Sequence, residues 1–318
     1  MKILDCTLRD GGFRTDFNWD LKFANRYYNL LSNFNIPYIE LGYWKQKSKS
    51  INPFYNLGLK EVEIITKSAT KHNATIIIDY HYCDKDVKIY PKKNQTPISM
   101  IRITSRKENI DEAISFADKL ASFTNLDLSF QIINSTNYSK KELENTVKKL
   151  SKSNFLYIYF ADSHGNLHLP IDYWRFEDSI FCIRENNKKV GFHLHNHTNR
   201  ALLNYYFCLE KKIEMVDSTI LGMGKGAGNL KLEEIIRNEN FIELLYFIKK
   251  ESKHFKLNET DFLYNSISGR LNITDNYAKQ AMENKVDLYD FYEICSGIRG
   301  KQKDTFDKKI LKLNKDLS

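Results

Sequence analysis

Short apolar runs and longer amphipathic stretches alternate along the first three-quarters of the chain. The short runs show the period of strands, and the longer ones repeat apolar residues every three or four positions, as helices do. Eight such pairs occupy roughly 240 residues, the usual size of a (β/α)8 barrel. Strands are expected near 3–9, 38–42, 75–80, 99–103, 127–132, 156–161, 190–195 and 214–220, and helices near 21–33, 59–72, 110–122, 140–151, 171–185 and 201–211.

The pattern predicts an α/β fold, a (β/α)8 TIM barrel with a small C-terminal helical appendage. The alternation stops after the eighth unit, so we divide the chain into a catalytic barrel (1–252) and an appendage (253–318). Helices are expected near 277–284 and 288–295, and the lysine-rich tail 300–318 is either a surface helix or partly disordered. An open, doubly wound sheet is the competing architecture for the same alternation.

Polar residues gather at the expected carboxyl ends of the strands. Active sites of such barrels lie at this end, so side chains from different strands can meet there. The first strand is expected to end in Arg9 and Asp10, before two glycines that loosen the turn. The candidate site residues at this rim are Arg9, Asp10, Glu40, His81, Asp162, His193 and His195.

The two faces of the first strand differ in polarity. Because side chains alternate, Asp5, Thr7 and Arg9 are expected to share a polar face towards the barrel mouth. The alternate residues, Leu4 and Cys6 among them, are then expected on an outward apolar face. We therefore interpret Cys6 as a packed small hydrophobe rather than a nucleophile.

His193 and His195 are spaced so that both imidazoles leave one face of a strand. With the Asp10 carboxylate they form a two-nitrogen, one-oxygen ligand set for a divalent cation. Such a set leaves positions that a 2-oxo acid can chelate. Mn²⁺ or Mg²⁺ fits best, and Zn²⁺ or Co²⁺ also fits. The same ligand set describes non-haem Fe(II) oxygenases, an option that the barrel fold disfavours.

A glycine-rich loop, Gly222–Asn229, follows the last expected strand. It lacks the order of a P-loop, and no βαβ unit with a ribose-binding acid follows it, so both nucleotide-binding interpretations are rejected. In a barrel, such a loop folds over the site. We expect Asn229 to reach the metal and Lys225 to reach an anion.

Composition and charge exclude several classes of protein. The chain has 318 residues and a formal charge of +8, but its lysines are scattered among acids, which is typical of solvated surfaces rather than of nucleic-acid binders. Its five cysteines share no CxxC spacing, which favours a reducing compartment. No apolar run approaches the ~18 residues of a membrane span. A cytoplasmic protein that binds neither membrane nor nucleic acid is expected.

Five motifs in this order resemble those of the DRE-TIM metallolyase superfamily. They are TLRDG at Thr7–Gly11, IELG at Ile39–Gly42, FADSHG at Phe160–Gly165, GFHLHN at Gly191–Asn196 and GMGKGAGN at Gly222–Asn229. This superfamily contains hydroxymethylglutaryl-CoA lyase, 4-hydroxy-2-oxovalerate aldolase, and isopropylmalate and homocitrate synthases. The resemblance covers about residues 2–235 and is specific, because five motifs agree in sequence order.

The resemblance implies a role for each matching residue. Asp10, His193 and His195 would be metal ligands, with Asn229 as a fourth. Arg9 would stabilise an enolate, and Glu40 would hold Arg9. We expect Arg9, Asp162 and Lys225 to contact the substrate.

Two departures leave the general acid or base open. Phe13 and Arg14 stand where the hydroxy-oxovalerate aldolases carry a histidine, and the glycine loop lacks the cysteine of the hydroxymethylglutaryl-CoA lyases. Candidates for proton transfer are His81, Tyr43 and Tyr82.

The expected function is that of a divalent-metal-dependent aldolase or lyase. It would cleave or form a carbon–carbon bond of a small 2-oxo acid through a metal-bound enolate, for example releasing pyruvate and an aldehyde from a 4-hydroxy-2-oxo acid. The alternative is an acyl-CoA-dependent condensing acyltransferase, and a third option is a non-catalytic binding barrel. A homo-oligomer, specifically a dimer, is expected.

Overall fold

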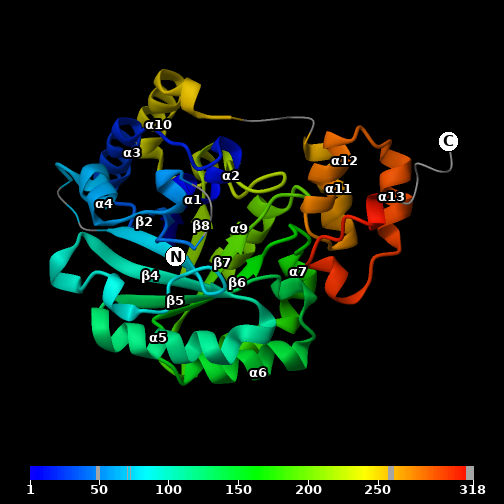
Figure 1. Cartoon of the computed structure of the whole chain (residues 1–318), viewed down its shortest axis with the longest axis horizontal. Coiled ribbons are helices and arrows are strands. Elements are labelled where there is room, and N and C mark those ends of the chain that lie inside the picture. Colours follow the sequence, from blue (N-terminus) through cyan, green and yellow to red (C-terminus); the bar gives the residue numbers. More distant parts are fainter. Residues whose placement is uncertain (48–50, 70, 72, 257–260, 313–318) are drawn as a thin grey trace.

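The protein is described by a computed structural model over residues 1–47, 51–69, 71, 73–256 and 261–312. Within these ranges, eight parallel strands close into a barrel in chain order, because β1 pairs with both β2 and β8 (Figure 1). The (β/α)8 prediction is therefore confirmed, and the open-sheet alternative is wrong. The strands are β1 (Lys2–Asp5), β2 (Tyr38–Tyr43), β3 (Ala74–Asp79), β4 (Ile98–Ser105), β5 (Asp127–Ile132), β6 (Tyr157–Asp162), β7 (Lys189–Leu194) and β8 (Met215–Ser218).

Helices surround the barrel and bury their apolar faces against it. Side-chain caps fix where two of them begin: Asp20 accepts a hydrogen bond from the Phe23 N–H, and Ser139 and Glu142 form a capping box. The long helix expected over 171–185 is interrupted by a 3₁₀ turn at Tyr173–Arg175. The surrounding helices are α3 (Leu21–Asn33), α4 (Leu59–Thr66), α5 (Ile110–Thr124), α6 (Lys140–Ser151), α7 (Leu169–Asp172), α8 (Glu177–Glu185), α9 (Ala201–Glu210) and α10 (Asn238–Lys250).

The first strand is shorter than expected. β1 ends at Asp5 because the Asp5 carboxylate accepts hydrogen bonds from the backbone N–H of Thr7, at 3.1 Å, and from its hydroxyl, at 2.8 Å. Two short helices follow this turn, α1 (Thr7–Asp10) and α2 (Gly12–Thr15). Arg9 and Asp10 therefore lie on a helical turn at the rim rather than at the end of a strand.

The predicted faces of this strand are inverted. Leu4 and Cys6 are fully buried in one apolar cluster with residues of β4, β6 and β8, and residues of these strands can meet only inside the barrel. Thr7, by contrast, accepts a hydrogen bond from the Tyr27 hydroxyl of α3 at 2.8 Å. The predicted outward placement of Cys6 is wrong. Asp5 faces helix α3, so Leu4 and Cys6 on the other face point into the barrel.

The barrel interior is filled in layers, as is usual for this fold. One layer is apolar and aromatic, and the next is charged. The contact between them is a cation–π pair, with the Arg102 guanidinium 4.6 Å from the centre of the Tyr159 ring. Members of the apolar cluster are Leu4, Cys6, Met100, Tyr157, Tyr159 and Met215.

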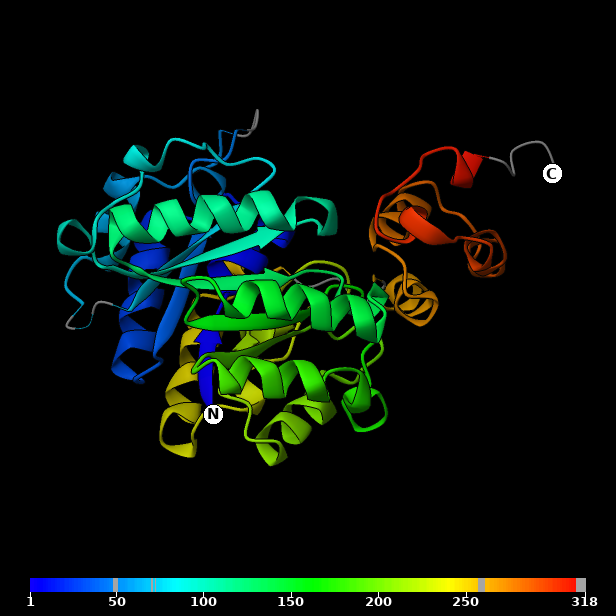
Figure 2. The same cartoon turned by 90° about the horizontal axis from the view of Figure 1, so that it is seen from below.

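The C-terminal helices form an appendage with an apolar cluster of its own. They are α11 (Asp261–Leu271), α12 (Asn276–Glu283) and α13 (Leu288–Ser296). In Figures 1 and 2 they lie, orange to red, beyond the end of the barrel to which the strand arrowheads point. The tail continues as 3₁₀ turns at Gly300–Lys303 and Ile310–Lys312, and residues 313–318 lie outside the described ranges.

The chain leaves the barrel after α10. Phe255 still packs edge-on against Phe23 of α3, with ring centres 5.7 Å apart. The division at residue 252 stays a prediction. Among the described residues, no helix is both long and apolar enough to cross a membrane.

Candidate metal centre

Three side chains that are distant in sequence converge at the mouth of the barrel. His193 on β7 and His195 just after it turn their Nε2 atoms towards each other, 3.2 Å apart. The Asp10 Oδ2 atom lies 3.8 Å from the Nε2 of His193. One ligand atom of each residue lies within 4.8 Å of the others, and all three residues are buried. Two imidazole nitrogens and a carboxylate oxygen therefore surround one point.

Asn229 joins this cluster from the glycine-rich loop. Its amide N–H donates to Asp10 Oδ2, whereas its buried Oδ1 has no hydrogen-bond partner among the described residues. The loop is held by the end of β7, since Leu230 N–H donates to the Leu194 carbonyl at 3.0 Å. A Cβ at Gly224 would lie 2.4 Å from the Asn229 amide nitrogen and 2.7 Å from Asp10 Oδ2. A glycine is needed there for the loop to pass so close.

The residues present fit a divalent cation. Burial alone would raise the pKa of Asp10, but the charge of Arg9 and the hydrogen bond from Asn229 oppose it, and that pKa lies below its usual range. Burial lowers the pKa of His195 well below its usual value, so its ring is neutral. A carboxylate, imidazole nitrogens and the unpartnered Asn229 oxygen are the donors that such ions take.

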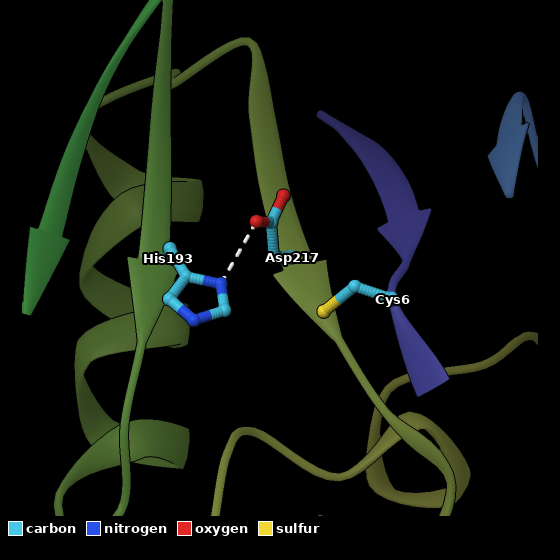
Figure 3. A group of neighbouring side chains, drawn as sticks. All are labelled: Cys6, His193 and Asp217. Atoms are coloured by element: carbon cyan, nitrogen blue, oxygen red, sulfur yellow. Dashed lines mark hydrogen bonds and ion pairs between the residues drawn. The ribbon is translucent and has the colours of Figure 1, made fainter. Parts of the chain in front are cut away.

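His193 is oriented by a carboxylate behind it. Its Nδ1 lies 2.8 Å from Asp217 Oδ2 on β8. A dashed line marks this contact in Figure 3. With the proton on Nδ1, the ring donates to Asp217 and leaves the Nε2 lone pair facing Asp10 and His195. A carboxylate in this position fixes the tautomer and makes the imidazole a better metal ligand.

Cys6 lies beside this pair, and Figure 3 shows its thiol, from the residue just after β1, pointing towards Asp217. Cys6, His193 and Asp217 also bring ligand atoms within 4.8 Å of one another. Burial, however, raises the pKa of the thiol well above its usual range. The thiol donates weakly to the Ser218 carbonyl at 3.4 Å. A protonated thiol is a poor ligand, so the Asp10 cluster is the better cation site.

A chain of buried charges links the cluster to Arg9. Arg102 on β4 donates to Asp217 Oδ2 at 2.6 Å and to Glu40 Oε1 at 3.1 Å. Glu40 also accepts from Arg9 Nε at 2.6 Å, and Arg9 donates to Asp10 Oδ1. Arg9 is thereby held beside Asp10 with its guanidinium fixed from both sides.

The sequence did not lead us to Arg102 or Asp217. Each is a single charged residue inside an apolar strand, ISMIRITS and MVDS respectively. A charge within a strand expected to be buried needs a partner of opposite charge, so the two could have been sought as a pair. Gln131 on β5 is a further partner of Arg102. When its amide oxygen faces Arg102, it accepts a hydrogen bond from Arg102 Nε at 2.8 Å.

Three predicted site residues have other partners. His81 is exposed, and its ring contacts that of Tyr82 with centres 4.6 Å apart. Asp162 Oδ1 accepts backbone hydrogen bonds at 2.9 and 3.2 Å from residues 166 and 167, which shapes the loop after β6. Lys225 forms a 2.6 Å ion pair with Asp275 of the appendage.

Tyr43, one of the three acid or base candidates, is half-buried and is influenced by the charges of Arg9 and Asp10. Burial raises its pKa, and the charge of the nearby Arg9 opposes that effect. Tyr82, the third candidate, is 39% exposed.

The closed barrel carries a buried group of possible metal ligands at its mouth, and a sequence comparison identifies the family. A family profile described as HMGL-like matches residues 1–261, so the chain belongs to the HMGL-like family. This family generally uses a divalent metal.

Relatives of differing activity match the chain. An oxaloacetate decarboxylase of Mycobacterium tuberculosis is 22% identical over 253 residues, covering 74% of this chain and 68% of the relative. A 4-hydroxy-2-oxovalerate aldolase of Geobacillus genomosp. 3 is 23% identical over 238 residues, covering 74% and 69%. A 2-isopropylmalate synthase of Aquifex aeolicus is 26% identical over 245 residues, covering 74% of this chain but 46% of the synthase.

The fold has a solved counterpart over nearly its whole length. The N-terminal domain of a putative aldolase from Bacteroides vulgatus superposes with a TM-score of 0.71 at 23% identity. It covers 92% of this chain and 99% of that domain. The family thus includes lyases, decarboxylases and synthases, and its members share the barrel.

Proposed function

We propose that the protein is a divalent-metal-dependent carbon–carbon lyase that acts on a small 2-oxo acid. The observation that carries this proposal is the cluster of Asp10, His193, His195 and Asn229 with the Arg9 guanidinium fixed beside it. Mn²⁺ or Mg²⁺ suits an oxygen-rich shell completed by a chelating substrate.

The charges buried around the cluster support a substrate with one carboxylate. Asp10, Glu40 and Asp217 are opposed by Arg9 and Arg102, so these five side chains together carry one negative charge. A divalent cation changes the balance to one positive charge. A 2-oxo acid monoanion then makes the buried site neutral, and burying a neutral set costs least.

Arg9 is placed to stabilise the charge that develops during cleavage. Breaking the bond to the carbon next to a 2-oxo group leaves an enolate, whose oxygen becomes negative. A bound cation would supply Lewis-acid polarisation of the 2-oxo group. The Arg9 guanidinium is held by Glu40 and needs no reorganisation to donate to that oxygen. Tyr43 is our candidate for moving the proton.

The activities of the relatives favour the formation of such an enolate, but they do not identify the group that leaves or adds. Decarboxylation of oxaloacetate and retro-aldol cleavage of a 4-hydroxy-2-oxo acid both leave an electron pair on the carbon next to a 2-oxo group. One site can therefore serve either reaction.

Deuterium exchange into the methyl group of pyruvate tests the proposal. We expect proton NMR in D₂O to show exchange with Mn²⁺ or Mg²⁺, its loss with EDTA, and its return when metal is restored. Cleavage of oxaloacetate and of 4-hydroxy-2-oxo acids is then compared to find the leaving group. Absence of exchange with each of Mn²⁺, Mg²⁺, Zn²⁺ and Co²⁺ would contradict the proposal.

A second candidate is a condensing acyltransferase, which the synthase match favours. The matched region is less than half of that synthase, so the chain shares its barrel rather than its whole length. Release of free thiol from acetyl-CoA only when a 2-oxo acid is present would support this candidate over the lyase.

A further inference from the structure

Two cavities lie along the seam between the barrel rim and the appendage. The first, of about 660 Å³, is bordered by Gly224, whose backbone touches the Asp10 cluster, and by α12. The second, of about 940 Å³, lies between the loops after β4 and β5 and residues 300–306. Asn276 borders both cavities, so they adjoin at the first residue of α12.

These cavities are large for a small 2-oxo acid. Pockets of about 300 to 1,000 Å³ hold ligands of drug size. The side chains of the Asp10 cluster border neither cavity, so a three-carbon acid bound at the cluster leaves both cavities free. The seam therefore has room for a bulky partner, whose reactive end would face the cluster and whose far end would reach the second cavity.

The second cavity carries an excess of positive charge. Five of its side chains are cationic and three are acidic. Lys107 is paired with Glu142, and Arg175 donates to two backbone carbonyls. Arg106, Lys301 and Lys303 have no carboxylate partner in the described parts of the chain, although Lys303 donates to the Leu271 carbonyl at 3.4 Å. Glu108 is the one lining acid there without a cationic partner or hydrogen bond.

A buried hydroxyl in the same cavity also lacks a partner. Tyr138 is 3% exposed, and its Oη finds no hydrogen bond among the described residues. Buried hydroxyl groups are rarely left unpaired, because the lost hydrogen bond to water is not replaced. The oxygen itself has almost no exposed surface, so a ligand with several acceptor oxygens would satisfy it after a small movement of the Tyr138 side chain.

We propose that the second cavity binds a phosphate group of the compound that reacts with, or is released from, the 2-oxo acid. The proposal rests on the proposed lyase function and adds the class of its partner. A phosphate ester carries between one and two negative charges and three acceptor oxygens. It therefore matches three cations that lack a carboxylate partner better than a single carboxylate does. Arg106 can bind phosphate through two parallel hydrogen bonds, and Lys301 and Lys303 add point charges.

Two kinds of compound would bring a phosphate group to this cavity. One is a phosphorylated aldehyde, and the other is the phosphate-rich end of a coenzyme A thioester. Titration calorimetry with glycerol 3-phosphate, an unreactive analogue of a phosphorylated aldehyde, and with coenzyme A separates them. Tight binding of the first identifies the aldehyde, and tight binding of the second identifies the thioester.

The test compares the double variant Arg106→Ala/Lys301→Ala with a matched control. Lys308→Ala removes a lysine from the same tail, where it is exposed and does not border the cavity. We expect the double variant to weaken probe binding by about tenfold or more, since it removes two charge-assisted hydrogen bonds. The control is expected to change it by less than about twofold, as for a surface charge.

Two results would overturn the proposal: wild-type protein that binds neither probe, and an equal loss of binding in Lys308→Ala. Pyruvate exchange measured on wild-type protein reports on the metal centre separately. Exchange without probe binding refutes only the phosphate site, whereas binding without exchange refutes only the lyase function.

Discussion

The barrel and the appendage contribute to the candidate site in different ways. Every side chain of the proposed cation cluster comes from the barrel, whose strands and buried charges fix its position. The appendage adds no ligand to that cluster but forms one wall of both cavities. The difference suggests that the barrel determines the chemistry at the 2-oxo acid and the appendage determines which partner is accepted.

The two parts meet through close polar contacts. His164 Nδ1 lies 3.0 Å from Asn272 Oδ1, and Lys225 pairs with Asp275. Lys225 belongs to the loop that carries Asn229, so the appendage steadies the loop without touching the ion site. Variants in the barrel and in the appendage should therefore separate the two functions.

The largest effect is expected from Asp10→Asn. The substitution removes the one anionic donor of the cluster and breaks the ion pair between Asp10 and Arg9, which keeps its pair with Glu40. We expect bound divalent metal to be lost and pyruvate exchange to fall by more than about 10³-fold. Elemental analysis and NMR measure both. Asp16→Asn, the same change at an exposed position nearby, is the control and should retain metal and exchange. Normal metal content in Asp10→Asn would disprove the cluster.

A smaller effect is expected from Asp217→Asn. The amide cannot hold the proton of His193 Nδ1 as a carboxylate does, so His193 loses basicity and orientation. Such changes behind a ligand weaken metal binding by roughly 10- to 100-fold. The dissociation constant of Mn²⁺ from calorimetry is the measurement, and Asp127→Asn at the opposite end of the barrel is the control. Equal affinities in the two variants would show that Asp217 does not position His193.

The fold was more predictable than the interior of the site. The expected ends of β2 to β7 lie within two residues of the observed ones, because buried strands carry a strong local pattern. The end of β1 was missed because a local hydrogen bond, from Thr7 to Asp5, overrides that pattern. That error also reversed the placement of Cys6.

The partners of charged residues were the hardest to predict. The motifs predicted that Arg9, Asp10, His193 and His195 belong to one site, and the fold brings these residues together. Lys225 was expected to meet an anion in the substrate and instead meets Asp275. That pairing joins segments far apart in the chain, and neither segment carries a local signal of it.

A modest effect confined to the appendage is expected from Gly269→Ala. A Cβ there would lie 2.9 Å from His197 Cβ and 3.0 Å from Thr198 Cγ2, so α11 must move away from the barrel. We expect a loss of about 1–3 kcal/mol in stability and faster amide exchange in α11 to α13. KM for the partner substrate should rise while pyruvate exchange is retained.

Gly297→Ala is the control for this variant. A Cβ at Gly297 has its nearest neighbour at 3.8 Å, an ordinary contact. If Gly269→Ala abolished pyruvate exchange, the division of labour between barrel and appendage would be wrong.

The smallest effect on catalysis is expected from Asp5→Asn, which tests the barrel's stability instead. Burial raises the pKa of Asp5 from 3.8 to about 7, although hydrogen bonds from Thr7 and Tyr27 oppose the rise. Between pH 4 and 7 the folded protein thus holds a proton that the unfolded chain has released. The free energy of unfolding contributed by Asp5 therefore falls as pH rises through this window, by at most roughly 4 kcal/mol.

Asparagine at position 5 does not ionise, so the variant lacks this pH dependence. The melting temperature of the variant minus that of wild type should rise from pH 4 to 7 and level off above. A difference independent of pH would show that Asp5 is ionised in the folded barrel throughout this range.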